Sequence, residues 1–187
     1  MKLLVSLFLV VVMALPNQAQ TTINGVTLPA ELSYGEQTMS LNGGGIRTKL
    51  IFKLYTGGLY LAEKSSDADA IIKADKPMAV RLAITSNKIN STNFSEAIRE
   101  GFEKSTGNNT TAIQGKIDKL IEAFSREPIV PGDVFDVVWM PGEGVKTYKG
   151  KTLKSTIEGL EFKQALYGIW LSDNPVSGSL KNGMLGK

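Results

Sequence analysis

Hydrophobic and polar residues alternate along the first half of the chain, which is the pattern of strands with two different faces. Four strands are predicted on this basis, over residues 22–28, 36–42, 46–61 and 78–85. The third is the longest, with Leu50, Phe52 and Leu54 on one face and Lys49, Ile51, Lys53 and Tyr55 on the other.

The hydrophobic spacing then changes to three and four residues, which predicts helices. One helix follows Asn93, which we expect to be its N-cap, with Glu96 completing a capping box. A second helix ends before Pro128, and a short one is predicted over residues 67–74. The two long helices carry these apolar stripes: Phe94, Ala97, Ile98, Gly101 and Phe102; and Ile113, Ile117, Leu120, Ile121 and Phe124.

The last third of the chain returns to strands and ends in helices. Residues 134–140 are apolar on nearly both faces, which indicates a buried strand. A hairpin is predicted over 145–157, followed by helices over 160–171 and 177–184. This order predicts one α+β domain, an antiparallel sheet with helices packed on one side. A cleft between the two layers is the default ligand site of such a domain.

The first twenty residues have the pattern of an export signal. Lys2 is followed by an apolar run over 3–15 and by a small, polar segment near Ala19. The run is too short to span a bilayer, and no second apolar run follows. We therefore expect a signal peptide over residues 1–20, a mature domain over 21–187 without an integral membrane segment, and a periplasmic or secreted location.

Composition excludes several kinds of chemistry. The chain has no cysteine and no histidine, so it offers no disulfide, no thiolate, no Ser-His-Asp triad and no common zinc ligand. No metal or other cofactor is expected. The net charge of +3, with acidic and basic residues interspersed, does not indicate nucleic-acid binding. The sequence does not indicate an oligomeric state.

Two glycine-containing motifs do not fit nucleotide-binding loops. Gly150-Lys151-Thr152 lacks the first glycine of a phosphate loop, and a strand follows it where a helix is required. The run 43–45 lacks the dinucleotide-binding spacing, and we expect it to form a tight turn. The pair Gly57-Gly58 indicates a bulge or a close backbone approach. The basic run over 146–154 is interpreted as a solvated hairpin.

Three segments resemble the chalcone isomerase superfamily, in particular its bacterial chalcone isomerase-like branch. They are Asn42-Gly-Gly-Gly-Ile-Arg47, Lys53-Leu-Tyr-Thr-Gly-Gly-Leu-Tyr-Leu61 and Ala165-Leu-Tyr-Gly-Ile-Trp-Leu-Ser-Asp-Asn-Pro-Val-Ser-Gly-Ser-Leu-Lys181. The resemblance covers essentially the whole mature chain. It implies an open-faced β-sandwich, in which helices cover a large antiparallel sheet.

The resemblance also implies where catalytic groups would lie. Chalcone isomerases use an arginine, which falls on Arg47, and a tyrosine, which falls on Phe94. Their helix lysine and asparagine fall on Ala97 and Gly101, their late threonine near Ile169 and their strand threonine near Tyr55. Phe94 has no hydroxyl, and loss of such a donor typically costs about 10²–10³ in rate. We therefore assign no catalytic residue, and these positions favour a protein that is not an enzyme.

The superfamily also includes fatty-acid-binding members, in which an arginine and a tyrosine are thought to hold the carboxylate. The resemblance therefore makes Arg47 and Tyr55 candidates for holding the carboxylate of a fatty acid or similar apolar acid. The expected ligand-binding residues are Arg47, Tyr55, Phe94, Ala97, Ile98, Phe102 and Ile169.

Two other functions remain open: an isomerase or lyase acting on an activated carbonyl substrate, and a structural or partner-binding envelope protein. Regular alternation would place Arg47 with Lys49 and Lys53 on a solvent face, unless a twist or bulge redirects it.

Overall fold

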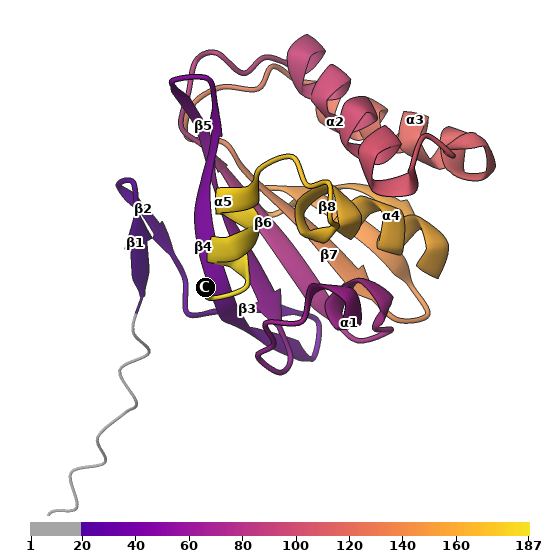
Figure 1. Ribbon diagram of the computed structural model, residues 1–187, viewed down its shortest axis with the longest axis horizontal. Helices are drawn as coiled ribbons and strands as arrows, with labels where there is room; N and C mark the ends of the chain where they lie inside the picture. Colours follow the sequence, from indigo (N-terminus) through magenta and orange to yellow (C-terminus); the bar gives the residue numbers. More distant parts are fainter. Residues whose placement is uncertain (1–19) are drawn as a thin grey trace, which may run out of the picture.

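The computed structural model describes residues 20–187, so the predicted signal segment lies outside the described residues apart from Gln20. Seven strands form one antiparallel sheet in the order β3-β4-β5-β6-β7-β8-β9, and β1 and β2 form a separate hairpin (Figure 1). The strands are β1 (Thr21–Ile23), β2 (Val26–Leu28), β3 (Glu31–Tyr34), β4 (Gln37–Lys49), β5 (Phe52–Leu61), β6 (Met78–Ile84), β7 (Val134–Met140), β8 (Gly144–Lys149) and β9 (Thr152–Ile157).

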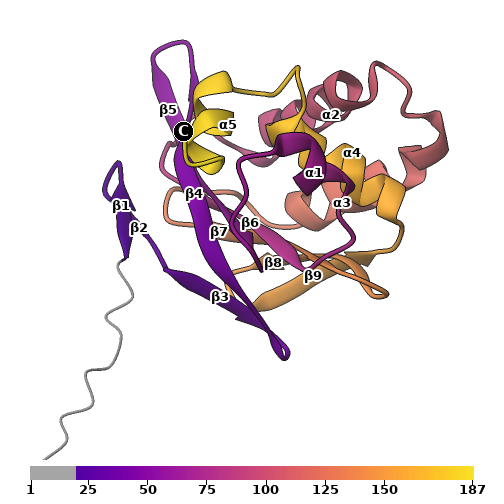
Figure 2. The same ribbon diagram turned by 60° about the horizontal axis from the view of Figure 1, so that its bottom comes forward.

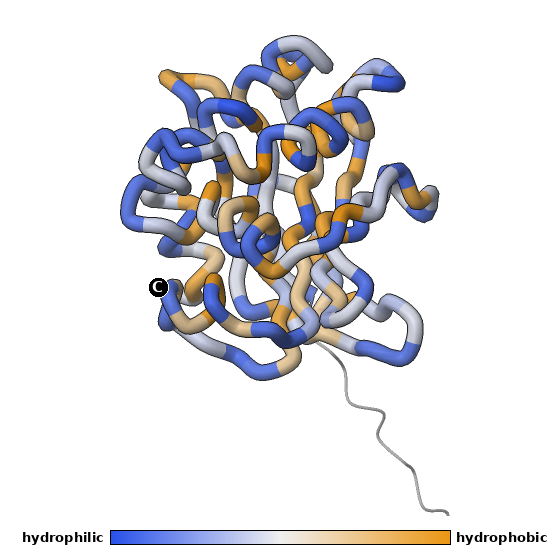
Figure 3. The backbone as a smooth tube through the Cα atoms, turned by 90° about the vertical axis from the view of Figure 1, so that its right-hand side faces the viewer, coloured by the Kyte–Doolittle hydropathy of each residue, from blue (hydrophilic) through white to orange (hydrophobic). Residues whose placement is uncertain are grey.

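Helices cover one face of this sheet, as the sequence predicts (Figures 1 and 2). They are α1 (Ala68–Lys73), α2 (Ser91–Thr106), α3 (Gln114–Ser125), α4 (Leu160–Leu171) and α5 (Gly178–Met184). The main hydrophobic core lies between the two layers, and hydrophobic stretches gather there while the outer turns are mostly hydrophilic (Figure 3). The fold is the predicted α+β, open-faced β-sandwich. No helix of residues 20–187 has both the length and the apolarity needed to cross a bilayer.

The capping box of α2 begins three residues earlier than predicted. Asn90 is the N-cap and Asn93 is the third helical residue, and each side chain bonds the other's backbone N–H at 3.0 Å. The prediction chose Asn93 and Glu96 because Glu is the usual partner at this position, whereas an asparagine makes the same reciprocal contact here.

The glycine run 43–45 lies inside β4 and is not a turn, which corrects the expectation. A Cβ added to Gly43 would lie 2.2 Å from the backbone oxygen of Gly183 in α5, and one added to Gly57 would lie 2.8 Å from the Met184 side chain. On the opposite face, a Cβ at Gly44 would lie 2.6 Å from the side chain of Leu28 in β2. The glycines therefore let α5 and the β1–β2 hairpin approach the sheet from its two sides.

The predicted long strand over 46–61 is in fact two strands joined by a tight turn. Leu50 and Ile51 form this turn, and Leu50 adopts a positive φ of 56°. Neither residue is a usual turn former, so no local pattern indicates a break at this point.

A second, smaller core shows that the sheet curls. Tyr34 in β3 donates a hydrogen bond to Asp136 in β7 at 2.6 Å, although three strands separate these two in the sheet. Arg81 in β6 binds both oxygens of the same carboxylate at 2.7 Å. Burial and the Asp136 carboxylate raise the pKa of Tyr34, so its hydroxyl keeps the proton that it donates.

The glycine contact predicts a destabilised Gly43→Ala variant. Backbone atoms must move to accept the added methyl group, which we expect to lower the free energy of unfolding by about 1–3 kcal/mol in urea denaturation. Gly115→Ala in α3 is the control, because its Cβ would meet nothing within 4 Å. That variant should be neutral or stabilised by up to about 1 kcal/mol. Equal stabilities of the two variants would contradict the contact.

The curl predicts that Tyr34→Phe lowers the free energy of unfolding by about 1.5–3 kcal/mol, because a buried carboxylate loses one hydrogen bond. Tyr148→Phe is the matched control, since its ring lies 4.9 Å from that of Tyr34 but its hydroxyl makes no hydrogen bond within residues 20–187. Chemical denaturation compares the two. If Tyr34→Phe lowers the free energy of unfolding no more than Tyr148→Phe does, this hydrogen bond does not stabilise the fold.

Candidate functional site

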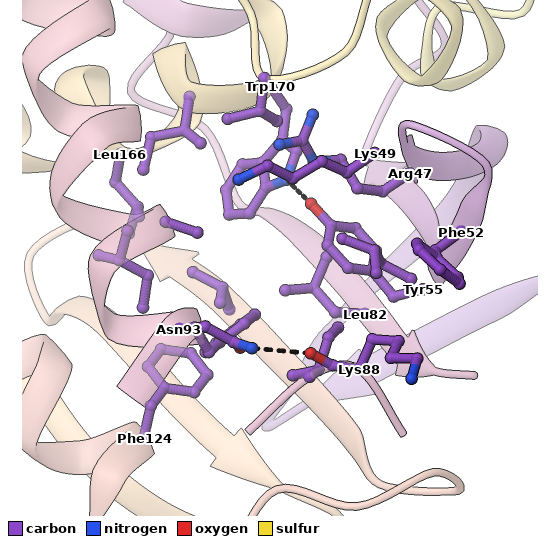
Figure 4. Close-up of a pocket in the computed structure, with 18 of the residues that line it drawn as sticks. Arg47, Lys49, Phe52, Tyr55, Leu82, Lys88, Asn93, Phe124, Leu166 and Trp170 are labelled. Atoms are coloured by element: carbon purple, nitrogen blue, oxygen red, sulfur yellow. Dashed lines mark hydrogen bonds between the residues drawn. The ribbon is translucent and has the colours of Figure 1, made fainter. Parts of the chain in front are cut away.

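A cavity of about 220 Å³ lies between one end of the sheet and helices α2, α3 and α4 (Figure 4). Most of its wall is apolar, and these side chains come from both layers. The apolar lining residues are Leu50, Phe52, Leu54, Leu82, Ile89, Phe94, Ala97, Ile98, Leu120, Phe124, Val137, Leu166, Ile169 and Val176. Such a wall suits the hydrocarbon part of a ligand.

The charged residues that line the cavity are all cations. They are Arg47 and Lys49 from β4 and Lys88 from the loop before α2, and no carboxylate of residues 20–187 lines the space. Within residues 20–187, none of the three has an acidic group within ion-pair distance. The cavity therefore combines an apolar interior with positive charge that remains available to an anion.

A bulge at Asn42 directs Arg47 and Lys49 into the cavity. Leu41 pairs with Tyr60 and Gly43 with Leu59, so Asn42 is an extra residue in β4, and the side chains after it change faces. The Asn42 amide holds this bulge by bonding the backbone of Ser65 and the carbonyl of Met184 at 2.8–2.9 Å. Gly43, Gly45, Arg47 and Lys49 then share the face that the helices cover.

The second bulge, at Leu54 in β5, separates Lys53 from this group. Arg47 pairs with Tyr55 and Thr48 with Lys53, so the side chain of Lys53 lies on the face opposite Arg47. There its Nζ donates to Asn24 of the β1–β2 hairpin at 3.1 Å. The uniform alternation of the three basic residues that favoured a solvent-facing Arg47 is therefore broken.

Tyr55 and Trp170 join the sheet to α4 at the cationic end of the cavity, beside Arg47 and Lys49 (Figure 4). Trp170 Nε1 donates to the Tyr55 hydroxyl oxygen at 3.1 Å. Burial raises the pKa of Tyr55, although the Trp170 hydrogen bond and the Arg47 charge act in the opposite direction. The hydroxyl is neutral, and it donates no hydrogen bond within residues 20–187, so its proton is available to an acceptor in the cavity.

Helix α4 is anchored by three polar side chains spaced along one face. Lys163 donates to the carbonyl oxygens of the last turn of α1 at 2.7–2.9 Å. Tyr167 Oη lies 2.9 Å from the Met78 carbonyl and 3.0 Å from that of Val137 in the sheet. Trp170 adds its bond to Tyr55, so positions i, i+4 and i+7 fix the helix that forms one wall of the cavity.

The structure brings most of the expected ligand-binding residues together. Arg47, Tyr55, Phe94, Ala97, Ile98 and Ile169 all line the cavity. Phe102 does not, because it lies deeper in the layer between α2 and α4, where its ring stacks on Phe162 at 5.5 Å.

Sequence reasoning missed several other lining residues. Lys49 shares the strand parity of Arg47, and Trp170 lies in one of the quoted segments, so both could have been proposed. The positions of Leu82, Val137 and Lys88 depend on how the strands and loops come together, which local patterns do not reveal.

The helical wall offers no free polar group for chemistry. Asn93 is engaged in the capping box and donates to the Lys88 carbonyl at 2.7 Å. A Cβ at Gly101 would lie 2.8 Å from the Ile169 side chain, so Ile169 fills the space beside this glycine. Among residues 20–187 there is also no group of three or more acidic side chains placed to hold a metal ion.

Comparison with known proteins gives a family and a fold. A solved structure of similar shape is the Arabidopsis thaliana fatty-acid binding protein AtFAP1, with a TM-score of 0.70 and 16% sequence identity over 89% of this chain and 96% of that one. No curated protein matches the sequence. The family model described as "Chalcone isomerase-like" matches residues 20–186, and the chain belongs to this family.

Proposed function

We propose that the protein binds a fatty acid or a similar apolar carboxylate, without transforming it, in the cavity between the sheet and the helices. The observation that carries this proposal is the lining itself: within residues 20–187 it consists of fourteen apolar residues and three unpaired cations beside Tyr55, Asn93 and Trp170, with no carboxylate. A hydrocarbon tail fits the apolar wall, and an anionic headgroup fits the end at Arg47, Lys49 and Tyr55.

The energetics indicate that the tail supplies most of the affinity and the headgroup supplies the selectivity. Each buried methylene contributes about 0.8 kcal/mol, so a tail of several methylenes dominates the affinity. A charge-assisted hydrogen bond to Arg47 contributes about 1.5–3 kcal/mol and selects the carboxylate. The neutral Tyr55 hydroxyl can donate a further bond to the same group.

The helical wall supports binding in preference to isomerisation. The positions at which the resemblance places the family's tyrosine, lysine and asparagine are Phe94, Ala97 and Gly101, and none carries a donor to stabilise charge on a ketone. The plant protein whose structure is similar is a fatty-acid binding protein, which supports this proposal.

We also propose that the protein is exported and matures near residue 21, as the pattern of residues 1–20 predicts. N-terminal sequencing of the protein recovered from its cell of origin should then begin close to Thr21. A chain that retains Met1 would contradict export by cleavage.

Binding should depend on Arg47 only when the ligand carries a carboxylate. Isothermal titration calorimetry of delipidated protein with dodecanoate and dodecanol tests this. Arg47→Gln should raise the Kd for dodecanoate by roughly 10- to 150-fold, following the 1.5–3 kcal/mol above, and leave the Kd for dodecanol nearly unchanged.

Two further variants act as controls. Arg99→Gln removes an exposed arginine of α2 that pairs with Asp118 away from the cavity, and it should leave both affinities unchanged. Ala97→Phe fills the apolar part of the cavity and should abolish both. Equal losses for the acid and the alcohol in Arg47→Gln, or no binding of dodecanoate to the wild type, would contradict the proposed function.

A further inference from the structure

The turn between β4 and β5 exposes an unusual amount of apolar surface. Leu50 is 87% exposed, Ile51 84% and Phe52 42%. Residues 20–187 contain five exposed large hydrophobic residues, and three of them are consecutive here. The turn projects from the edge of the sheet beyond the body of the protein in both views of the ribbon (Figures 1 and 2). A cluster of exposed apolar residues at a projecting tip indicates a site that contacts another protein or a membrane.

Four cations lie on the two strands that carry this tip or in the loop beside it: Arg47, Lys49, Lys53 and Lys88. Lys88 Nζ lies 5.6 Å from the centre of the Phe52 ring. None of the four has an ion-pair partner within residues 20–187. Glu100 on α2 is paired with Lys104 at 2.5 Å, and this hydrogen bond, with smaller contributions from the charges of Lys104, Lys49 and Arg47, lowers the pKa of its carboxyl group.

The other lysine-rich hairpin differs from this one. In β8 and β9, Lys146 pairs with Glu143, Lys149 with Asp133, and Lys154 with Glu127. Those charges are neutralised within the protein. Unpaired cations therefore gather around the β4–β5 turn, where the exposed apolar residues also lie, whereas only Lys151 of the β8–β9 hairpin has no ion-pair partner within residues 20–187.

The tip is continuous with the mouth of the cavity. Lys49, Leu50, Phe52 and Lys88 belong both to the projecting turn or its surroundings and to the cavity lining. These lining residues are exposed, so the cavity opens beside the tip. A membrane or protein that covers the tip therefore also covers the entrance to the proposed ligand site.

We propose that the β4–β5 turn inserts into the surface of a lipid bilayer that contains anionic lipids, so that the apolar acid exchanges directly between the bilayer and the cavity. This proposal rests on the proposed function. Leu50, Ile51 and Phe52 enter the boundary between headgroups and acyl chains, and the exposed Lys53 and Lys88 beside them contact the lipid phosphates. A second copy of the chain fits less well, because a symmetric contact would bring two sets of four cations together.

Co-sedimentation with vesicles tests the surface. Wild-type protein should partition at least about tenfold more strongly into vesicles of phosphatidylcholine with 30% phosphatidylglycerol than into phosphatidylcholine alone, and added salt should weaken this preference. Ile51→Glu and Lys53→Glu should each reduce partitioning at least about fivefold. Neither residue lines the cavity.

Matched control variants carry the same changes elsewhere. Leu153→Glu alters an exposed apolar residue on the edge strand β9, and Lys64→Glu alters an exposed lysine beyond the opposite end of β5. Both should bind vesicles like the wild type. No preference of the wild type for anionic vesicles, or undiminished binding by Ile51→Glu, would overturn the proposal.

Two further measurements separate this proposal from ligand binding. The Kd for dodecanoate in vesicle-free solution should be unchanged in Ile51→Glu, while stopped-flow transfer of a fluorescent fatty acid from vesicles should slow. A wild type that binds dodecanoate but ignores vesicles refutes the membrane contact alone. Vesicle binding without any dodecanoate binding refutes the proposed function and with it the exchange step. A dimer that Ile51→Glu abolishes, in a protein that ignores vesicles, would assign the tip to a second copy.

Discussion

The bulge at Asn42 is the constraint on which the site depends. Successive residues of a strand point to opposite faces, so one extra residue changes the face of every side chain that follows. Met39, before the bulge, belongs to the second core, whereas Gly43 and Gly45, after it, lie against α5. The same change of face places Arg47 and Lys49 in the cavity. Asn42 bonds the Met184 carbonyl, so the bulge and the docking of α5 support each other.

The glycines near this bulge serve both faces of the sheet. Gly43 and Gly57 leave room for α5, while Gly44 and Gly58 leave room for Leu28 from the β1–β2 hairpin. Because α5 occupies the glycine part of β4 and begins beside Gly45, the rest of the strand, from Arg47 onwards, borders the cavity between the layers. The cavity therefore begins where the glycines stop, and its first side chain is Arg47.

Local patterns predict the helices and most of the strands because each buries a single stripe or face. The stripe Ile117, Leu120, Ile121 and Phe124 is buried in α3 as expected. Patterns failed where distant segments decide the conformation. The run 43–45 forms a strand because α5, which follows it in the sequence by more than a hundred residues, packs against it. The break at Leu50 and Ile51 carries no turn-forming residue and leaves apolar side chains in solvent.

Only part of the candidate site could be predicted, because the positions of some lining residues depend on the packing of distant segments. Arg47 and Tyr55 came from the family resemblance, and the apolar stripe of α2 indicated Phe94, Ala97 and Ile98. The stripe also includes Phe102, but a helical stripe does not show which of its residues meets a cavity and which meets another helix. Lys88 lies in a loop whose position depends on the packing of Phe52 and Asn93 around it.

The proposed function places an anionic headgroup in the cavity beside unpaired cations. Carbon-13 NMR of bound octanoic acid, labelled at the carboxyl carbon, measures the pKa of that carboxyl group in a pH titration. Nearby cations favour the ionised form, so the account predicts a pKa below that of the free acid, with the shift largely lost in Arg47→Gln. A bound carboxyl whose pKa is raised would contradict the account, because it would lie in the apolar part of the cavity, away from Arg47.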